Sequence, residues 1–143
     1  MAEYVLDPAV ACRWFFPSAQ GKYVVEARAL LDAVASGKDI AHVPTVFSYE
    51  VCGWLASEGA RSGLDAERAA AAIRSLPLVF HELDAELTPA ALLAARRHEV
   101  DFFTACYLAL AEKLIRPYLC PNDELVERLS GSSRIASLGP SPA

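Results

Sequence analysis

Short apolar runs alternate with longer stretches of helical spacing along the whole chain, and this alternation restricts the possible folds most strongly. The short runs, which predict strands, are residues 4–6, 40–43, 78–80, 117–120 and 134–137. Strands that alternate with helices favour a parallel sheet with crossover helices on both faces. The sequence therefore predicts an α/β fold of three layers, α/β/α, with four or five short parallel strands. An apolar content of 54% suits such a doubly covered sheet.

The segments between these runs predict the helices. Helices are expected over residues 8–16, 22–36, 44–57, 64–76, 88–98, 102–114 and 121–129. Pro8 and Pro44 each suit the first turn of a helix, and Thr88 is expected to cap the next-to-last long helix ahead of Pro89. Residues 59–63 are expected to form a turn. The length predicts one domain over residues 1–138 and a flexible Gly/Pro/Ser tail over residues 139–143.

Composition limits where such a chain acts. No apolar run approaches the roughly 20 residues that cross a bilayer, and the N-terminus lacks a basic segment followed by an apolar one. A cytoplasmic protein without a membrane partner is therefore expected. The net charge of −5 does not indicate general nucleic-acid binding. The same charge is also compatible with carboxylates gathered at a metal site. The charge alone therefore does not decide whether the chain has such a site.

The cysteines and histidines do not form a recognisable metal motif. The chain has four cysteines, none of them in a CxxC pair, and three histidines without ligand spacing. They are Cys12, Cys52, Cys106, Cys120, His42, His81 and His98. The cysteines stand among apolar residues, so we expect four reduced thiols buried in the core.

Asp7 is the first residue that indicates a function. It follows the apolar run of residues 4–6 directly, and open parallel sheets bind ligands at the carboxyl ends of their strands. An Asp before Pro8 is also a good helix N-cap, so this position alone has two interpretations.

Several segments, taken together, resemble the VapC-type toxins of the PIN-domain family. Residues 4–15 resemble the family's opening, in which an apolar strand delivers an Asp and the next helix ends in a basic residue and Trp, here Arg13-Trp14. Residues 43–51 look like its second motif, a Pro followed by a Glu. Residues 107–112 and 119–125 are similar to its third and fourth motifs. The likeness extends from Tyr4 to about Ser137 in the family's order.

The resemblance implies a PIN fold, a ribonuclease activity and particular partners. PIN domains are Mg²⁺- or Mn²⁺-dependent nucleases of RNA, with three or four acidic residues in a pocket at the strand ends. Carboxylates suit this role because Mg²⁺ prefers hard oxygen ligands. The family also implies a homodimer formed through helices and a VapB-type antitoxin that masks the pocket.

The family's acidic positions are only partly acidic in this chain. Asp7 and Glu50 match the first two positions. The third position holds Thr104, with Asp101 as the nearest acid three residues before it. The fourth holds Asn122, with Asp123 one residue later. Ala9 stands where the family has Ser or Thr. The expected metal ligands are Asp7, Glu50, Asp101 and Asp123, and the first three of these are also the expected catalytic residues. Thr104 and Asn122 are expected to line the pocket.

Two functional hypotheses follow from this partial match. In the first, Asp101 or Asp123 assists Asp7 and Glu50, and the chain is a ribonuclease of weakened activity, with Arg13 as a possible RNA contact. In the second, the site has decayed and the chain is a catalytically inactive binding or regulatory module. A phosphoacceptor of the receiver type is a poorer third, because a second acid near the first strand and a late-strand Lys are missing.

Each candidate also has a purely structural interpretation. Asp7 and Asp101 can be helix N-caps, and Asp123 can be a first-turn acid favoured by the helix dipole. Glu50 can lie on a solvated helix face, and Arg13 can be an ordinary surface arginine. For Glu50 the apolar neighbours favour the pocket.

Overall fold

The computed structural model describes residues 1–139 and contains one parallel sheet. Within these residues the strand order is β3-β2-β1-β4-β5. The strands are β1 (Glu3–Leu6), β2 (Ile40–Pro44), β3 (Val79–His81), β4 (Tyr118–Leu119) and β5 (Ile135–Ala136). All five predicted strands are therefore present, and the predicted α/β class is confirmed.

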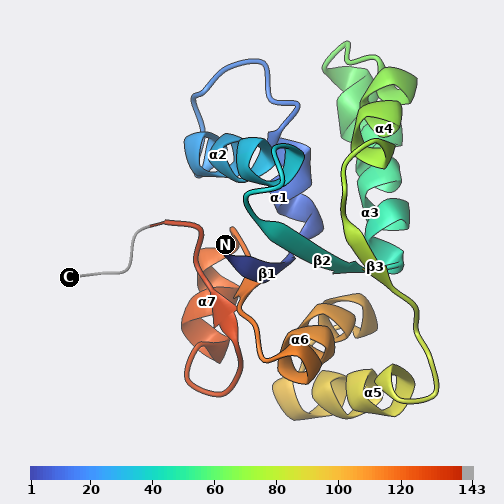
Figure 1. Cartoon of the computed structure of the whole chain (residues 1–143), viewed down its shortest axis with the longest axis vertical. Coiled ribbons are helices and arrows are strands. Elements are labelled where there is room, and N and C mark those ends of the chain that lie inside the picture. The colour runs from blue at the N-terminus through green and yellow to red at the C-terminus, as the bar shows by residue number, and fades with distance from the viewer. Residues whose placement is uncertain (140–143) are drawn as a thin grey trace.

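Helices cover both faces of the sheet and make the three predicted layers. They are α1 (Pro8–Arg13), α2 (Val24–Ala35), α3 (Val46–Trp54), the π-helical turn η1 (Leu55–Gly59), α4 (Ala66–Arg74), α5 (Leu87–His98), α6 (Phe102–Leu114) and α7 (Asp123–Leu129). Figure 1 shows α1 and α2 on one side of the sheet and α5 and α6 on the other. Helix α6 is the most buried of them, with seven consecutive buried residues from Ala105 to Ala111.

The order of the strands places a switch point beside β1. The chain builds β1, β2 and β3 outward in one direction, then returns to add β4 on the other side of β1. Crossover connections therefore leave β1 and β4 in opposite directions, which opens a crevice at their carboxyl ends. Asp7 follows β1 at this crevice, and its backbone N–H donates to the carbonyl of Leu119 at 3.1 Å. The segment after β4 carries Asn122 to the same edge.

Two predicted helix bounds, the end of the first helix and the start of the third, were wrong. Helix α1 ends at Arg13 rather than Phe16, because the N–H groups of Phe15 and Phe16 donate to carbonyls only three residues back, in tight turns. Pro44 does not open a helix; it is the last residue of β2, paired with His81 of β3. As the residue with no N–H, it can end a strand as easily as it can start a helix.

Two turn and cap assignments were also wrong. Residues 55–59 continue α3 as a π-helical turn, so the expected turn over residues 59–63 is confined to the last of them. Thr88 does not cap α5, which begins one residue earlier at Leu87. Asp84 satisfies the start of that helix instead, since its Oδ1 accepts from the N–H of Leu87 at 2.7 Å and of Glu86 at 3.1 Å.

Three of the four cysteines are buried as expected, but Cys52 is exposed on α3. Its neighbours in the sequence are apolar, yet it lies on the outer face of the helix. No helix within residues 1–139 has the length and apolar character to cross a bilayer. The expected tail begins at Gly139, and its residues 140–143 lie outside the described part of the chain.

Candidate functional site

Asp7 is held by two donors at the carboxyl end of β1. Its Oδ1 accepts from the N–H of Ala9 at 2.8 Å, which makes Asp7 the N-cap of α1. Its Oδ2 accepts from the hydroxyl of Tyr118 in β4. Val5 and Tyr118 are register partners, so the Tyr118 ring projects from the same face of the sheet as Val5. Asp7 is therefore both a helix cap and part of a polar cluster at the switch point.

Glu50 reaches the same region from helix α3. Its Oε1 accepts from the hydroxyl of Tyr107 in α6 at 3.0 Å. The rings of Tyr107 and Tyr118 stack, with centroids 5.5 Å apart and an interplanar angle of 18°. The two acids that match the family positions are thus linked through one buried tyrosine pair, Tyr107 and Tyr118, which we call the tyrosine pair.

Burial governs the ionisation of this cluster. Burial raises the pKa of Asp7, against the opposing effects of the Tyr118 hydroxyl and the Ala9 N–H. Burial also raises the pKa of Glu50; the Tyr107 hydroxyl opposes this, and the negative charges of Asp7 and Asp101 add to it. Burial raises the pKa of both tyrosines, so they remain protonated donors.

Asp101 serves mainly as the cap of α6. Its Oδ1 accepts from the N–H of Thr104 at 2.8 Å, and its Oδ2 accepts from the hydroxyl of Thr104 at 3.2 Å. Thr104 occupies the family's third acidic position and thus hydrogen-bonds to the acid that was expected to replace it. The negative charge of Asp101 still adds to the effect of burial that raises the pKa of Glu50.

Asp123 and Asn122 lie at the start of α7, where both have local partners. Asn122 is the N-cap, and its Oδ1 accepts from the N–H of Leu125 at 3.1 Å. Asp123 forms an ion pair with Lys22 and accepts from the Tyr23 hydroxyl at 2.5 Å. Lys22, followed by Tyr23, lowers the pKa of Asp123. Asp123 is thus engaged with the loop before α2.

Arg13 supports the loop after α1. Its Nε donates to the carbonyl of Lys22 and its Nη1 to the carbonyl of Ala9, both at 2.9 Å. Its positive charge opposes the effect of burial that raises the pKa of Asp7, and it adds to the effect of Lys22 and Tyr23 that lowers the pKa of Asp123.

The donor set suits a hard cation in kind but is small in number. Within residues 1–139, no three side chains of His, Cys, Asp or Glu are grouped closely enough to hold a metal ion. Asp7 and Glu50 supply carboxylate oxygens, which Mg²⁺ and Mn²⁺ prefer. Each of these carboxylates has one oxygen bound by a tyrosine hydroxyl. The residues therefore fit a weakly held divalent cation better than a tightly held one.

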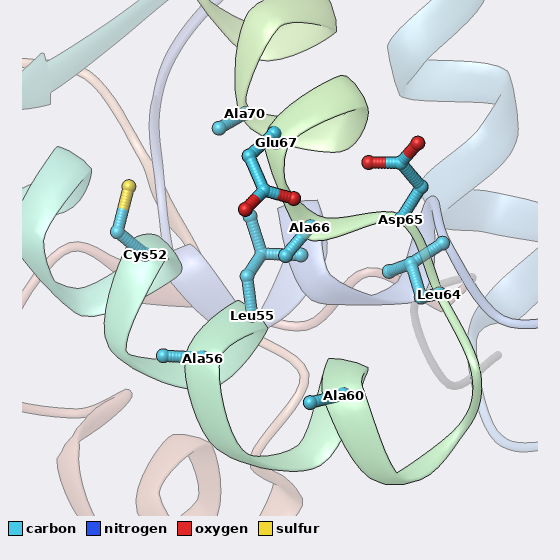
Figure 2. Close-up of a pocket in the computed structure, with 9 residues that line it drawn as sticks. All are labelled: Cys52, Leu55, Ala56, Ala60, Leu64, Asp65, Ala66, Glu67 and Ala70. Carbon is cyan, nitrogen blue, oxygen red and sulfur yellow. The ribbon is translucent and has the colours of Figure 1, made fainter.

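A separate groove of about 670 Å³ runs between α3, η1 and α4 and contains none of the candidate acids. Figure 2 shows small side chains along it, among them Ala56, Ala60 and Ala70, with Asp65 and Glu67 among the residues that line it. It offers carboxylates only from the start of α4, so we do not assign the chemistry to it.

Sequence reasoning missed the partners of the two matched acids. Tyr118 lies far from Asp7 in the sequence, and only the return of the chain to the side of β1 brings its hydroxyl to the Asp7 carboxylate. His42 and His81 were also missed as a pair, although their Nδ1 and Nε2 atoms lie 2.9 Å apart on adjacent strands. The signal in each case is strand adjacency, which spacing along the chain does not contain.

Replacing Asp101 separates its role as a cap from its role as a charge. Asp101→Ala removes the acceptor for Thr104, so we expect the free energy of unfolding to fall by about 1 kcal/mol. Asp101→Asn keeps the acceptor and should lose much less. Urea denaturation of both variants measures this. An equal loss in both would show that the charge, and not the cap, stabilises the helix.

Asp7 should make the protein less stable at neutral pH than at acidic pH. Since the folded protein raises the pKa of Asp7 above 3.8, this residue's stabilising contribution is present below the unfolded pKa and is lost as pH rises through the folded pKa. Asn is an equally good N-cap. Asp7→Asn should therefore raise the free energy of unfolding at pH 7.

The difference between Asp7→Asn and the native chain should shrink as pH falls toward 4, as measured by urea denaturation across a pH series. Asp32→Asn, on the exposed face of α2, is the matched control and should change little. A less stable Asp7→Asn protein at pH 7 would contradict this prediction.

Solved structures with this fold include toxins of toxin–antitoxin pairs. A toxin–antitoxin complex from Klebsiella pneumoniae matches with a TM-score of 0.66 at 13% identity, over 95% of this chain and 98% of that chain. VapBC2 from Rickettsia felis, bound to a DNA fragment from its promoter, matches with a TM-score of 0.66 at 10% identity, over 94% and 98%. VapC20 from Mycobacterium tuberculosis, a sarcin–ricin loop cleaving toxin, matches with a TM-score of 0.59 at 21% identity, over 79% and 84%.

No protein-family model and no curated protein sequence matches the chain. The structural likenesses cover nearly the whole chain at low identity, so they establish the fold. The chain has the PIN fold of VapC-type proteins, as the sequence motifs implied.

Proposed function

We propose that this PIN-fold chain is a VapC-like endoribonuclease, the toxin of a toxin–antitoxin pair, with weakened divalent-metal-dependent activity. The observation that supports it is the link between Asp7 and Glu50 through the tyrosine pair at the switch point of the sheet. In an open parallel sheet this is the expected place for a ligand. The two acids are also those that match the family's motif.

Asp7 and Glu50 are the residues that would hold Mg²⁺ or Mn²⁺, with Asp101 as the acid nearest to assist. When bound, such a cation lowers the pKa of its water and stabilises charge on the scissile phosphate. Asp123 is the weaker candidate, because it already pairs with Lys22. Thr104 and Asn122 supply only neutral oxygens at the remaining family positions.

The shortage of carboxylates is the reason for proposing weakened activity. Two carboxylates carry less negative charge than the three or four of the family pattern, and both are stabilised by hydroxyl donors without a cation. Weak cation affinity then limits the fraction of molecules that can cleave.

The substrate and partners follow from the same proposal. RNA is the proposed substrate, and Arg13, near Asp7, is the proposed phosphate contact. The Klebsiella and Rickettsia structures contain antitoxins, so we propose a VapB-type antitoxin for this chain as well. We further propose a homodimer formed through helices and an action in the cytoplasm.

An inactive binding or regulatory module is the second candidate. The observation that favours it is that every candidate acid already has a donor within the protein. The donors are Tyr118 and Ala9 for Asp7, Tyr107 for Glu50, Thr104 for Asp101, and Lys22 and Tyr23 for Asp123. In that case the fold would be retained for its contacts with a second copy or a partner, and not for catalysis.

RNA cleavage with added Mn²⁺ decides between the two candidates. We expect slow cleavage by the native chain and none by Asp7→Asn, because Asp7 is one of only two matched acids. RNAs that contain a sarcin–ricin loop belong in the substrate set, since VapC20 cleaves that loop. Asp32→Asn is the control and should cleave like the native chain. Equal cleavage by Asp7→Asn, or none by the native chain, would favour the inactive module.

A further inference from the structure

The Tyr118 hydroxyl donates to the one oxygen of Asp7 that does not cap helix α1. Asp7 Oδ1 is committed to the backbone of α1 through the Ala9 N–H at 2.8 Å. Oδ2, the other oxygen, accepts from the Tyr118 hydroxyl. One acid of the pair thus has a donor on each of its oxygens, both from within the chain.

Tyr118 cannot easily move away from this position. Its side chain is 1% exposed, its ring stacks on Tyr107, and its backbone pairs with both β1 and β5. The fold therefore holds the ring, and with it the hydroxyl, in place. The Tyr118 hydroxyl is thus a fixed donor to Asp7, whereas a donor on a mobile surface residue could move away.

A donor and a cation compete for the same carboxylate charge. A hydroxyl that donates to a carboxylate stabilises it more in the absence of a cation than when a cation has already drawn off its charge. Such a hydroxyl usually also orients the carboxylate that binds the metal, so its removal can weaken metal binding. Here the Ala9 N–H keeps Asp7 oriented, so the loss of competition should outweigh the loss of support.

We infer that Tyr118 is a positioning residue that holds Asp7 in a hydrogen bond within the protein and thereby lowers the affinity of the pocket for a divalent cation. This inference rests on the proposed function, because it takes Asp7 to be a cation ligand. It adds a second cause of weak activity, separate from the acids missing at Thr104 and Asn122. Tyr107 acts in the same way on Glu50, but leaves Oε2 of that carboxylate unbound among the described residues.

Mn²⁺ binding, followed through the electron paramagnetic resonance signal of free Mn²⁺, tests the inference without an activity assay. Tyr118→Phe keeps the ring and removes the hydroxyl, and it should bind Mn²⁺ about tenfold more tightly than the native chain. The double variant Asp7→Asn with Tyr118→Phe should lose this gain, because the gain acts through Asp7. Thermal unfolding confirms that each variant is folded.

Tyr4→Phe is the matched control. Tyr4 is also buried, lies in strand β1, and donates its hydroxyl to Asp39 at 3.1 Å. This contact lies at the amino end of β1, whereas Asp7 follows the carboxyl end. Its loss should leave Mn²⁺ affinity unchanged. If Tyr118→Phe does not fold, Tyr107→Phe tests the same competition at Glu50 and should also bind Mn²⁺ more tightly than the native chain.

The outcomes distinguish failure of the inference from failure of the proposed function. Equal or weaker Mn²⁺ binding by Tyr118→Phe, with measurable binding by the native chain, overturns the inference alone. Binding by Tyr118→Phe where the native chain shows none supports it. If none of three proteins binds Mn²⁺, both the inference and the proposed metal dependence are overturned. The three are the native chain, Tyr118→Phe, and the double variant Thr104→Asp with Asn122→Asp.

Discussion

Thr104→Asp combined with Asn122→Asp should raise Mn²⁺-dependent RNA cleavage by about a hundredfold over the native chain. Both substitutions place carboxylates at the positions where the family motif has them. With Asp7 and Glu50 they would make a set of four, which a hard cation prefers over two. The rate of RNA cleavage at several Mn²⁺ concentrations measures the gain.

The two positions differ in what the added carboxylate costs. Asn122→Asp keeps the N-cap of α7, since Asp accepts from a backbone N–H as well as Asn does. Thr104→Asp places a second negative charge beside Asp101 and removes the hydroxyl that donates to Asp101. The double variant should therefore unfold at a lower temperature without metal and recover when Mn²⁺ is added.

Controls separate a restored site from a general effect of charge. Gln20→Asp with Ala85→Asp adds the same charge at two exposed positions and should leave cleavage unchanged. Asp7→Asn in the restored background should abolish cleavage. If the restored protein cleaves no faster than the native chain, the departures at Thr104 and Asn122 do not limit activity, and the cause lies elsewhere in the pocket.

The fold could be predicted because its signal is local. Each strand is a short apolar run bounded by turn residues or charges, and each helix has apolar residues at helical spacing, so all five strands were found. The carboxyl end of β1 as the place of Asp7 follows from the same pattern. Helix α6 was predicted to its ends, Phe102 and Leu114, because Asp101 before it is a strong N-cap.

The errors concern choices that tertiary contacts decide. Pro44 and Thr88 carry helix-start signals, but pairing with β3 keeps Pro44 in β2, and Asp84 satisfies the start of α5 before Thr88 can. The tyrosine pair was missed for a related reason. Tyr118 and Asp7 are 111 residues apart, and only the order of the strands brings them together.

Phe47→Ala should be the most damaging of the single substitutions considered for stability, with a loss of about 4 kcal/mol in the free energy of unfolding. Phe47 is 0% exposed and lies on α3, the helix that also carries Glu50. Removing its ring loses buried apolar surface and leaves a cavity that the packed sheet fills only in part. Since small domains are stable by about 5–15 kcal/mol, the variant should be close to unfolding at 37 °C.

Tyr49→Ala, two residues along the same helix, is the matched comparison. Tyr49 is 79% exposed, so its removal should change the free energy of unfolding by no more than about 0.5 kcal/mol. Urea denaturation of both variants at several protein concentrations measures the difference. A large loss for Tyr49→Ala that depends on concentration would mean that a second copy of the chain covers this face of α3, and the proposed homodimer would then include the helix that presents Glu50.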